Sequence, residues 1–261
     1  MSRPTKVHAV VDRQGRRRVF EYEEARPGWG PFRPMAEVAG APGGRSVDAA
    51  ANVLCQMFSK LAEGGAVDLT EAAGASDLVI DAVADVGLAK WLDTVRAYHE
   101  GTFQHCLLVT GVATSFGVKN RMRRADIARL TMAGLMHDIG KARIPLAILD
   151  KPGRLDPEEQ AIVQRHPVIG YDYLRAQNSA PIEVLSAVRH HHEYLDGSGY
   201  PDGISGADIG DITRIVTVCD IYGALIEERA YKPPKSPAEA IAILLTLARE
   251  GKVEESLVKA L

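Results

Sequence analysis

The sequence has few of the features that mark secreted or membrane-spanning proteins. Its 261 residues include only three cysteines, none of them in a C-x-x-C pair. We therefore expect neither a disulfide framework nor a thiolate metal site, and a reducing cytoplasm is the simplest location. The apolar stretch near the start is too short for a signal peptide. The apolar run at residues 240–248 has about half the length of a membrane span, so we expect no membrane segment.

The chain also lacks a strong charge of either sign. Lys and Arg total 31, Asp and Glu total 34, and the net charge is −3. This balance argues against a protein that coats nucleic acid through bulk positive charge, but it allows a local basic pocket for a small anion. The apolar fraction of 46% and the charged fraction of 25% are ordinary for a globular protein. At about 150 residues per domain, the length corresponds to fewer than two domains.

The N-terminal third combines short β-like segments with helical patterns. Residues 7–11 and 17–22 are rich in Val, Phe and Tyr, flank a turn signal and predict a hairpin. Residues 26–45 contain four prolines and five glycines and predict a loop. Two helices are expected after it, with Ser46 as the N-cap of the first and Ser76 or Asp77 as the N-cap of the second.

From about residue 101 onward, nearly every segment predicts a helix. Asp156 and Ser236, each followed by proline and by acidic residues, are strong helix-start signals. The expected helices cover residues 102–116, 124–138, 181–192, 211–225 and 254–261, with two more that begin near 156 and 236. We expect a mainly α fold, in which a helical domain at 95–261 follows an N-terminal α/β or helical region at 1–94 of unknown or regulatory role.

Seven residues of the helical part are of types that bind transition metals, and each lies near a helix end or on an apolar face. They are His105, His137, Asp138, His166, His191, His192 and Asp220. They are separated by roughly a helix and a loop each time, so a bundle can bring them to one centre. Seven ligands suit two ions about 3.5–4 Å apart, with Asp138 as the natural bridge. Mixed nitrogen and oxygen ligands favour Fe or Mn over a structural Zn.

Ordinary structural roles compete with this hypothesis. A single histidine on a helix is more often a packed or surface group than a ligand. Asp220 is harder to explain in this way, because an unpaired carboxylate buried in its apolar segment would cost several kcal/mol. Lys141, three residues after Asp138, either contacts a phosphate oxygen or balances the dipole at a helix end, and both interpretations remain open.

The order of these residues resembles the HD-GYP family, a subgroup of the HD metal-dependent phosphohydrolases. The resemblance extends over about residues 95–261. Within this range, shorter matches to the family pattern occur at 229–232 and 236–240. Its main motifs are His137-Asp-Ile-Gly-Lys141, His166-Pro167, His191-His-Glu193 and Asp196-Gly-Ser-Gly-Tyr-Pro201.

The resemblance implies an HD-type helical bundle with two or three metal ions. It implies hydrolysis of cyclic di-GMP to pGpG, and often onward to GMP, through a metal-bridged hydroxide. The seven residues above would be the metal ligands, and Asp138 and Lys141 would be catalytic. Substrate contacts would come from Lys141, Tyr200, Arg229 and Lys232. We expect a cyclic dinucleotide as substrate, no nucleic-acid polymer and no membrane, whereas a homodimer or a signalling-protein partner stays open.

Three positions depart from the family pattern. Gly101 stands where members with a third metal have glutamate, so two metals are favoured over three. Tyr194 replaces the usual arginine and Gly223 the usual aspartate, which leaves substrate preference and loop support open. Two other functions remain as alternatives: an HD-type phosphohydrolase for another nucleotide such as cyclic GMP-AMP, and a non-catalytic sensor or interaction module for the messenger.

Overall fold

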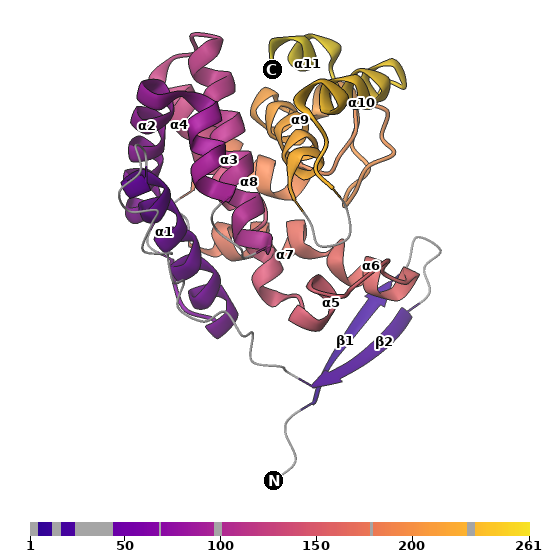
Figure 1. Cartoon of the computed structure of the whole chain (residues 1–261). Helices are drawn as coiled ribbons and strands as arrows, with labels where there is room; N and C mark the ends of the chain where they lie inside the picture. The colour runs from indigo at the N-terminus through magenta and orange to yellow at the C-terminus, as the bar shows by residue number, and fades with distance from the viewer. Residues whose placement is uncertain are drawn as a thin grey trace.

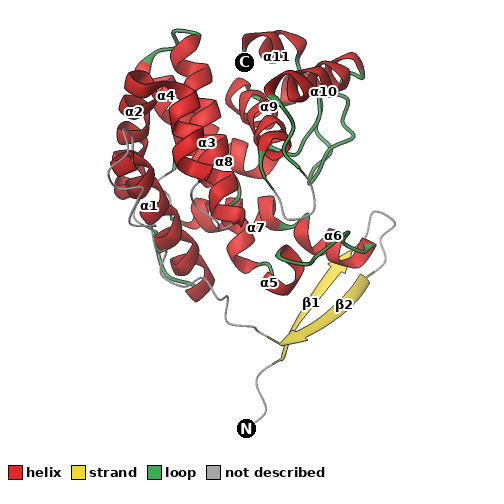
Figure 2. Cartoon of the chain, viewed as in Figure 1, coloured by secondary structure: helices red, strands yellow, loops and turns green. Residues whose placement is uncertain are grey.

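The protein is a bundle of helices with one small sheet (Figures 1 and 2). The computed structural model describes residues 5–11, 17–23, 44–67, 69–96, 101–177, 180–228 and 233–261. The longer helices are α1 (Gly44–Glu63), α2 (Leu69–Arg96), α3 (Gly101–Lys119), α4 (Arg124–Met136), α7 (His166–Ala176), α8 (Ile182–His190), α9 (Asp211–Ile226) and α10 (Pro237–Arg249). The shorter ones are α5 (Leu146–Leu149), α6 (Pro157–Val163), α11 (Glu255–Ala260) and the 3-10 helices η1 (Ile139–Arg143) and η2 (Gly206–Asp208). The prediction of a mainly α fold is confirmed.

The sheet is the predicted N-terminal hairpin. Strands β1 (Thr5–Val11) and β2 (Arg17–Glu23) pair antiparallel, with Thr5 opposite Glu23 and Val11 opposite Arg17. Most of the predicted loop at 26–45 lies outside the described residues, although its last two residues already belong to α1.

Two of the predicted helix starts are capping boxes. The Asp156 carboxylate accepts hydrogen bonds from the backbone N–H groups of Glu158 and Glu159, at 3.0 and 2.9 Å. At the start of α10 the Ser236 hydroxyl accepts one from the Glu239 N–H, at 3.3 Å. In both boxes the glutamate side chain accepts from the cap residue's own N–H, so orphan donors of the first turn are satisfied in both directions.

The predicted starts of the two earlier helices were wrong. Helix α1 begins at Gly44, before Ser46, and α2 begins at Leu69, before Ser76 and Asp77. The Ser76 side chain is buried inside α2, and its hydroxyl donates to the Ala72 carbonyl at 2.8 Å. A serine can bond back to the preceding turn as well as cap a helix, so the residue type alone did not fix the helix start.

Helix α3 is the centre of the bundle. It packs against α2, α4 and α9, and most of its side chains are buried. The Trp91 indole N–H of α2 donates to the Leu107 carbonyl of α3 at 3.0 Å. A Cβ on Gly111 would lie 2.1 Å from the Trp91 ring, so this glycine permits the close approach of the two helices. In the described part of the chain, every helix is too short or too polar to cross a membrane.

Helices α1 and α2 contribute to the same hydrophobic core as the later helices. Phe58 of α1 lies 5.0 Å from Phe103 of α3, measured between ring centroids, and α1 also packs against η1. The division at residue 94 between a regulatory region and a catalytic domain concerns function, and it stays a prediction.

Candidate metal centre

The seven predicted ligands lie where helices end or cross in the middle of the bundle. His137 and Asp138 form the turn between α4 and η1, and His191 and His192 form the turn after α8. His166 is the first residue of α7, while His105 and Asp220 come from the facing helices α3 and α9. Because the paired ligands follow helix ends, adjacent residues can face one point.

Three of the histidines are oriented by the backbone in the same way. The Nδ1–H of His137 donates to the Gly134 carbonyl at 2.7 Å, and that of His166 to the Val163 carbonyl at 2.7 Å. Nδ1 of His191 lies 3.1 Å from the carbonyl oxygen of the residue three positions earlier. A neutral imidazole has one N–H, so in each ring the Nε2 lone pair is left for another partner.

These lone pairs and the two aspartates converge. Nε2 of His166 lies 3.0 Å from Oδ1 of Asp138, and Nε2 of His137 lies 3.4 Å from Oδ2 of the same carboxylate. Nε2 of His105 is 2.8 Å from Oδ1 of Asp220. In the described residues, the potential ligand atoms form two groups that share Asp138. One group contains His166, His191 and His192, and the other contains His105 and His137.

Several buried polar atoms of the cluster lack a hydrogen-bond partner in the described residues. Nε2 of His137 and Oδ1 of Asp138 are buried without a hydrogen bond in the described structure. The Nε2 atoms of His166 and His191 lie 3.2 Å apart, although both rings present lone pairs there. Two facing lone pairs repel unless a cation lies between them. The donor set therefore fits a divalent metal held by nitrogen and carboxylate oxygen.

The ionisation states also suit metal binding. Burial, with His192 as a neighbour, holds the pKa of His191 well below its ordinary value, and burial lowers that of His192 to about 3. Both rings are therefore neutral at pH 7. Burial opposes ionisation of Asp138, but Lys141 and His137 outweigh it and hold the pKa of this carboxyl well below its usual range. These three ligands thus have the deprotonated forms that a metal requires.

Lys141 points back at the shared carboxylate. Its Nζ donates to Oδ2 of Asp138 at 2.6 Å, and one fifth of the side chain remains exposed. The ammonium group therefore lies at the rim of the cluster, on a 3-10 turn rather than at the end of a regular helix. Both predicted roles, contact with a phosphate and balance of a helix dipole, stay predictions.

Of the other predicted substrate contacts, Tyr200 lies at the cluster. Its ring stacks on the His192 imidazole, with centroids 4.7 Å apart and an angle of 26° between the planes. Arg229 and Lys232 lie outside the described residues. Gly223, one of the departures from the family pattern, faces α3. A Cβ there would lie 2.9 Å from Cγ2 of Val109, so this close contact leaves no room for the usual aspartate.

Two buried glutamates near the cluster were not predicted. Oε2 of Glu227, just after α9, lies 3.4 Å from Nδ1 of His105 and places a second carboxylate on that ring. Burial lowers the pKa of His105, but Asp220 and Glu227 outweigh it and raise the pKa to about 9. Glu193, which follows the ligand pair His191-His192, accepts hydrogen bonds from the loop that carries Tyr200. Its position beside the pair was the available signal.

The chain is similar to a known protein family and to several curated proteins. The family model described as "HD domain" matches residues 82–257. A cyclic di-GMP phosphodiesterase of Pseudomonas aeruginosa is 34% identical over 189 residues, which are 71% of this chain and 45% of that protein. The cyclic di-GMP phosphodiesterase response regulator RpfG of Xanthomonas campestris pv. campestris is 43% identical over 130 residues, or 49% of this chain and 34% of that protein.

A third relative has another named substrate. A 3'3'-cGAMP-specific phosphodiesterase of Vibrio cholerae is 43% identical over 121 residues, which are 46% of this chain and 26% of that protein. The chain therefore spans less than half the length of these three curated relatives. Among solved structures, an HDG"Y"P protein from Bdellovibrio bacteriovorus superposes with a TM-score of 0.65 at 18% identity, covering 84% of this chain and 69% of that one. That likeness supports the HD-type fold.

Proposed function

Because the chain belongs to the HD domain family, we propose that it is a cyclic di-GMP phosphodiesterase that produces pGpG and, in a further step, GMP. The observation that carries this proposal is the convergence of five histidines and two aspartates beside the Gly-Tyr-Pro loop. Relatives that match this part of the chain are named cyclic di-GMP phosphodiesterases. The HD-GYP resemblance and the proposed activity therefore rest on the same residues.

We propose two transition-metal ions, Fe or Mn, with Asp138 shared between them. Its two carboxylate oxygens face different histidines, His166 and His137, at 3.0 and 3.4 Å. When bound, such ions lower the pKa of a water nucleophile and neutralise charge on the phosphate oxygens. The backbone carbonyls that receive the Nδ1–H groups fix the tautomers and ring orientations, which raises the basicity of the ligands.

The remaining residues act on the substrate. Lys141, 2.6 Å from Asp138, would neutralise part of the charge that develops on the scissile phosphate. Tyr200, stacked on His192, would form one wall of the pocket. Arg229 and Lys232 would contribute further phosphate or base contacts. Residues 1–94 would regulate the domain or contribute to a homodimer. The protein would act in the cytoplasm, where a signalling protein is a further candidate partner.

The test is a substrate panel with product chromatography, run on protein purified without air and with its metal content measured. We expect about two metal ions per chain and conversion of cyclic di-GMP to pGpG. The double substitution His137→Ala with Asp138→Ala should abolish both bound metal and hydrolysis, and full activity in that variant would overturn the proposal.

The same panel tests the alternatives. Faster hydrolysis of 3'3'-cGAMP would favour the second candidate substrate, the one named for the 43% identical Vibrio cholerae relative. Tight binding of cyclic di-GMP without turnover in the Fe-loaded, Mn-loaded and metal-free protein would instead indicate a sensor.

A further inference from the structure

We propose that Glu193 is a positioning residue that clamps the loop 196–203 onto the metal-ligand pair and thereby sets Tyr200 against His192. The proposal rests on the proposed function for its consequences in catalysis, whereas the clamp itself rests on the geometry. Glu193 directly follows His191 and His192, and its side chain is only 1% exposed.

The clamp consists of two backbone hydrogen bonds to a single oxygen. Oε1 of Glu193 accepts from the N–H groups of Asp202 and Gly203, at 2.6 and 2.9 Å. In the described residues no cation pairs with this carboxylate, and its Oε2 is buried without a hydrogen bond. Burial of a charge is costly unless donors compensate it. In the described residues, these two charge-assisted bonds are the hydrogen bonds that the Glu193 carboxylate accepts.

The loop between the clamp and the ligands is packed tightly onto the backbone. The Tyr200 N–H donates to the His192 carbonyl at 3.2 Å. A Cβ on Gly199 would lie 2.4 Å from Cα of Glu193, so a side chain at this position would displace the loop. The loop is thus fixed on both sides of Tyr200, at the His192 carbonyl before it and at the Glu193 carboxylate after it.

A second set of contacts, made by the Asp202 side chain, also holds the loop. The Arg189 guanidinium donates to both carboxylate oxygens of Asp202, at 2.7 and 2.9 Å, and Nε2 of His190 lies 2.9 Å from one of them. These contacts are exposed, whereas the Glu193 bonds are part-buried and their carboxylate belongs to a side chain that is 1% exposed. Water can compete with the outer contacts, so we assign the positioning role to Glu193.

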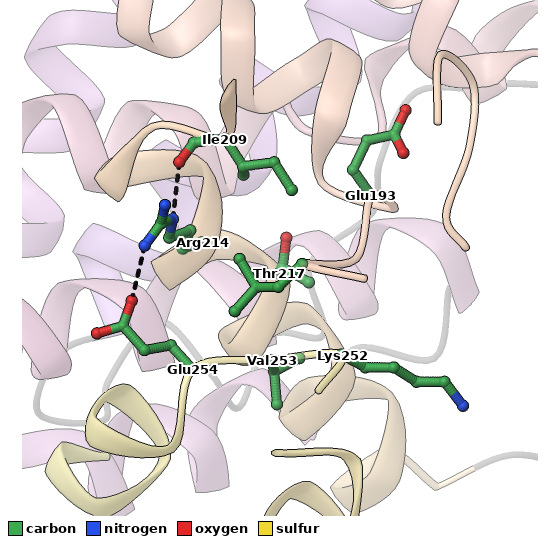
Figure 3. Close-up of a pocket in the computed structure, with 8 residues that line it drawn as sticks. Glu193, Ile209, Arg214, Thr217, Lys252, Val253 and Glu254 are labelled. Carbon is green, nitrogen blue, oxygen red and sulfur yellow. Dashed lines mark hydrogen bonds and ion pairs between the residues drawn. The ribbon is translucent and has the colours of Figure 1, made fainter. Parts of the chain in front are cut away.

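The chain offers a matched control on the other side of Glu193. Glu193 borders a small cavity together with Thr217 of α9 and with Lys252, Val253 and Glu254 (Figure 3). Glu254 pairs with Arg214 at 3.0 Å and makes none of the loop contacts described above. A change at Glu254 alters the same cavity without loosening the clamp.

The experiment compares Glu193→Ala, Glu193→Gln and Glu254→Gln in the metal-loaded full chain. Glutamine keeps a carbonyl oxygen that can accept both N–H groups, whereas alanine removes the acceptor. Amide hydrogen exchange of Asp202 and Gly203 should be about 10- to 100-fold faster in Glu193→Ala. The loss of a hydrogen bond to a charged group changes the equilibrium constant for local opening by about one to two orders of magnitude. Glu193→Gln should restore part of the protection and leave exchange severalfold faster than in the wild type, whereas exchange in α3 and in Glu254→Gln should match that of the wild type.

Activity then separates positioning from a general structural role. In Glu193→Ala we expect kcat/KM for cyclic di-GMP to fall about tenfold. Turnover of bis(4-nitrophenyl) phosphate, a small diester that reaches the metals without filling the pocket, should change less than threefold, with metal content unchanged. Glu193→Gln should recover most of the cyclic di-GMP activity.

Unchanged exchange of Asp202 and Gly203 in Glu193→Ala would overturn the clamp. An equal loss on both substrates together with a loss of metal would overturn the positioning role, because Glu193 would then support the ligands themselves. If the wild-type chain does not hydrolyse cyclic di-GMP, the proposed function fails while the exchange data still decide the clamp. If Glu193→Ala does not fold, exchange of the two amides in Glu193→Gln decides, since loss of the charge alone should still accelerate it severalfold.

Discussion

Gly140 lies in direct backbone contact with His166. A Cβ on Gly140 would be 2.0 Å from the His166 carbonyl oxygen and 2.7 Å from the Gly170 amide nitrogen. This contact brings η1 against the start of α7, and it accompanies the 3.0 Å distance between Asp138 and the His166 ring. The distance between two of the proposed ligands therefore depends on a residue that binds no metal.

Substitution of Gly140 by alanine should damage the centre without removing a ligand. The added methyl group has no space, so η1 and α7 must separate, at a cost of about 1–3 kcal/mol or more. We expect a lower Tm and a lower metal content per chain. The control is Gly74→Ala in α2, where a Cβ meets nothing within 4 Å and the helix should gain about 0.5–1 kcal/mol. A wild-type metal content in Gly140→Ala would contradict this account.

The sequence was most informative where local chemistry decides the structure. Proline and acidic residues after Asp156 and Ser236 predicted helix starts that the capping boxes confirm. The hairpin was predicted from residue types and a turn signal. Ser76 shows the limit of this reasoning, because its hydroxyl bonds within α2 and the helix starts a full two turns earlier.

The contacts between segments that are distant in the sequence could not be predicted. Gly140 follows the helix expected at 124–138, but its contact with His166 depends on how α7 packs, which no local pattern specifies. Glu227 is 122 positions from His105 in the chain and meets its ring only because α3 and α9 lie side by side. The ligand types were therefore predictable, while the residues that support them were not.

Removal of the metal should lower the stability of the fold. A cation held by the native cluster and not by the unfolded chain adds RT ln(1 + [L]/Kd), or about 2.7 kcal/mol at 100 times Kd. We expect a chelator to lower the Tm of the wild-type protein and added Mn²⁺ to restore it. The variant with both His137→Ala and Asp138→Ala should show the same Tm with and without the metal, and a metal-dependent Tm in that variant would place the ion elsewhere.

Glu227 should tune the affinity of the centre through His105. A carboxylate on the outer nitrogen of a ligand histidine fixes its ring and raises its basicity, and loss of such a partner typically costs about 10- to 100-fold in metal affinity. Glu227→Gln should therefore weaken metal binding, measured by titration against a competing chelator. Glu255→Gln, which alters an exposed pair with Lys259, serves as the control. Equal metal affinities in Glu227→Gln and Glu255→Gln would show that Glu227 does not support metal binding.

Lys141 offers a direct choice between its two predicted roles. If its ammonium contacts the phosphate, Lys141→Met should reduce kcat about 10²–10³-fold, as expected for the loss of one transition-state donor. Metal content should be retained, because the neighbouring Asp138 keeps its histidine contacts. Lys141→Arg should recover part of the activity. If Lys141→Met lowers Tm but leaves kcat unchanged, the lysine only balances the helix end and Asp138.

Truncated chains should show that the helical bundle folds without the N-terminal hairpin but not without α1 and α2. Strands β1 and β2 pack chiefly on each other, so a chain that begins at residue 44 keeps the described helical core. We expect its Tm to lie within a few degrees of that of the full chain. A chain that begins at residue 97 also loses α1 and α2, which exposes the face of α3 that Trp91 and Phe58 cover. Exposure of this apolar surface, at about 25 cal/mol per Å², should abolish cooperative unfolding. Cooperative unfolding of the chain that begins at residue 97, near the wild-type Tm, would instead show that the bundle folds without α1 and α2, and the predicted division at residue 94 would then be a structural boundary.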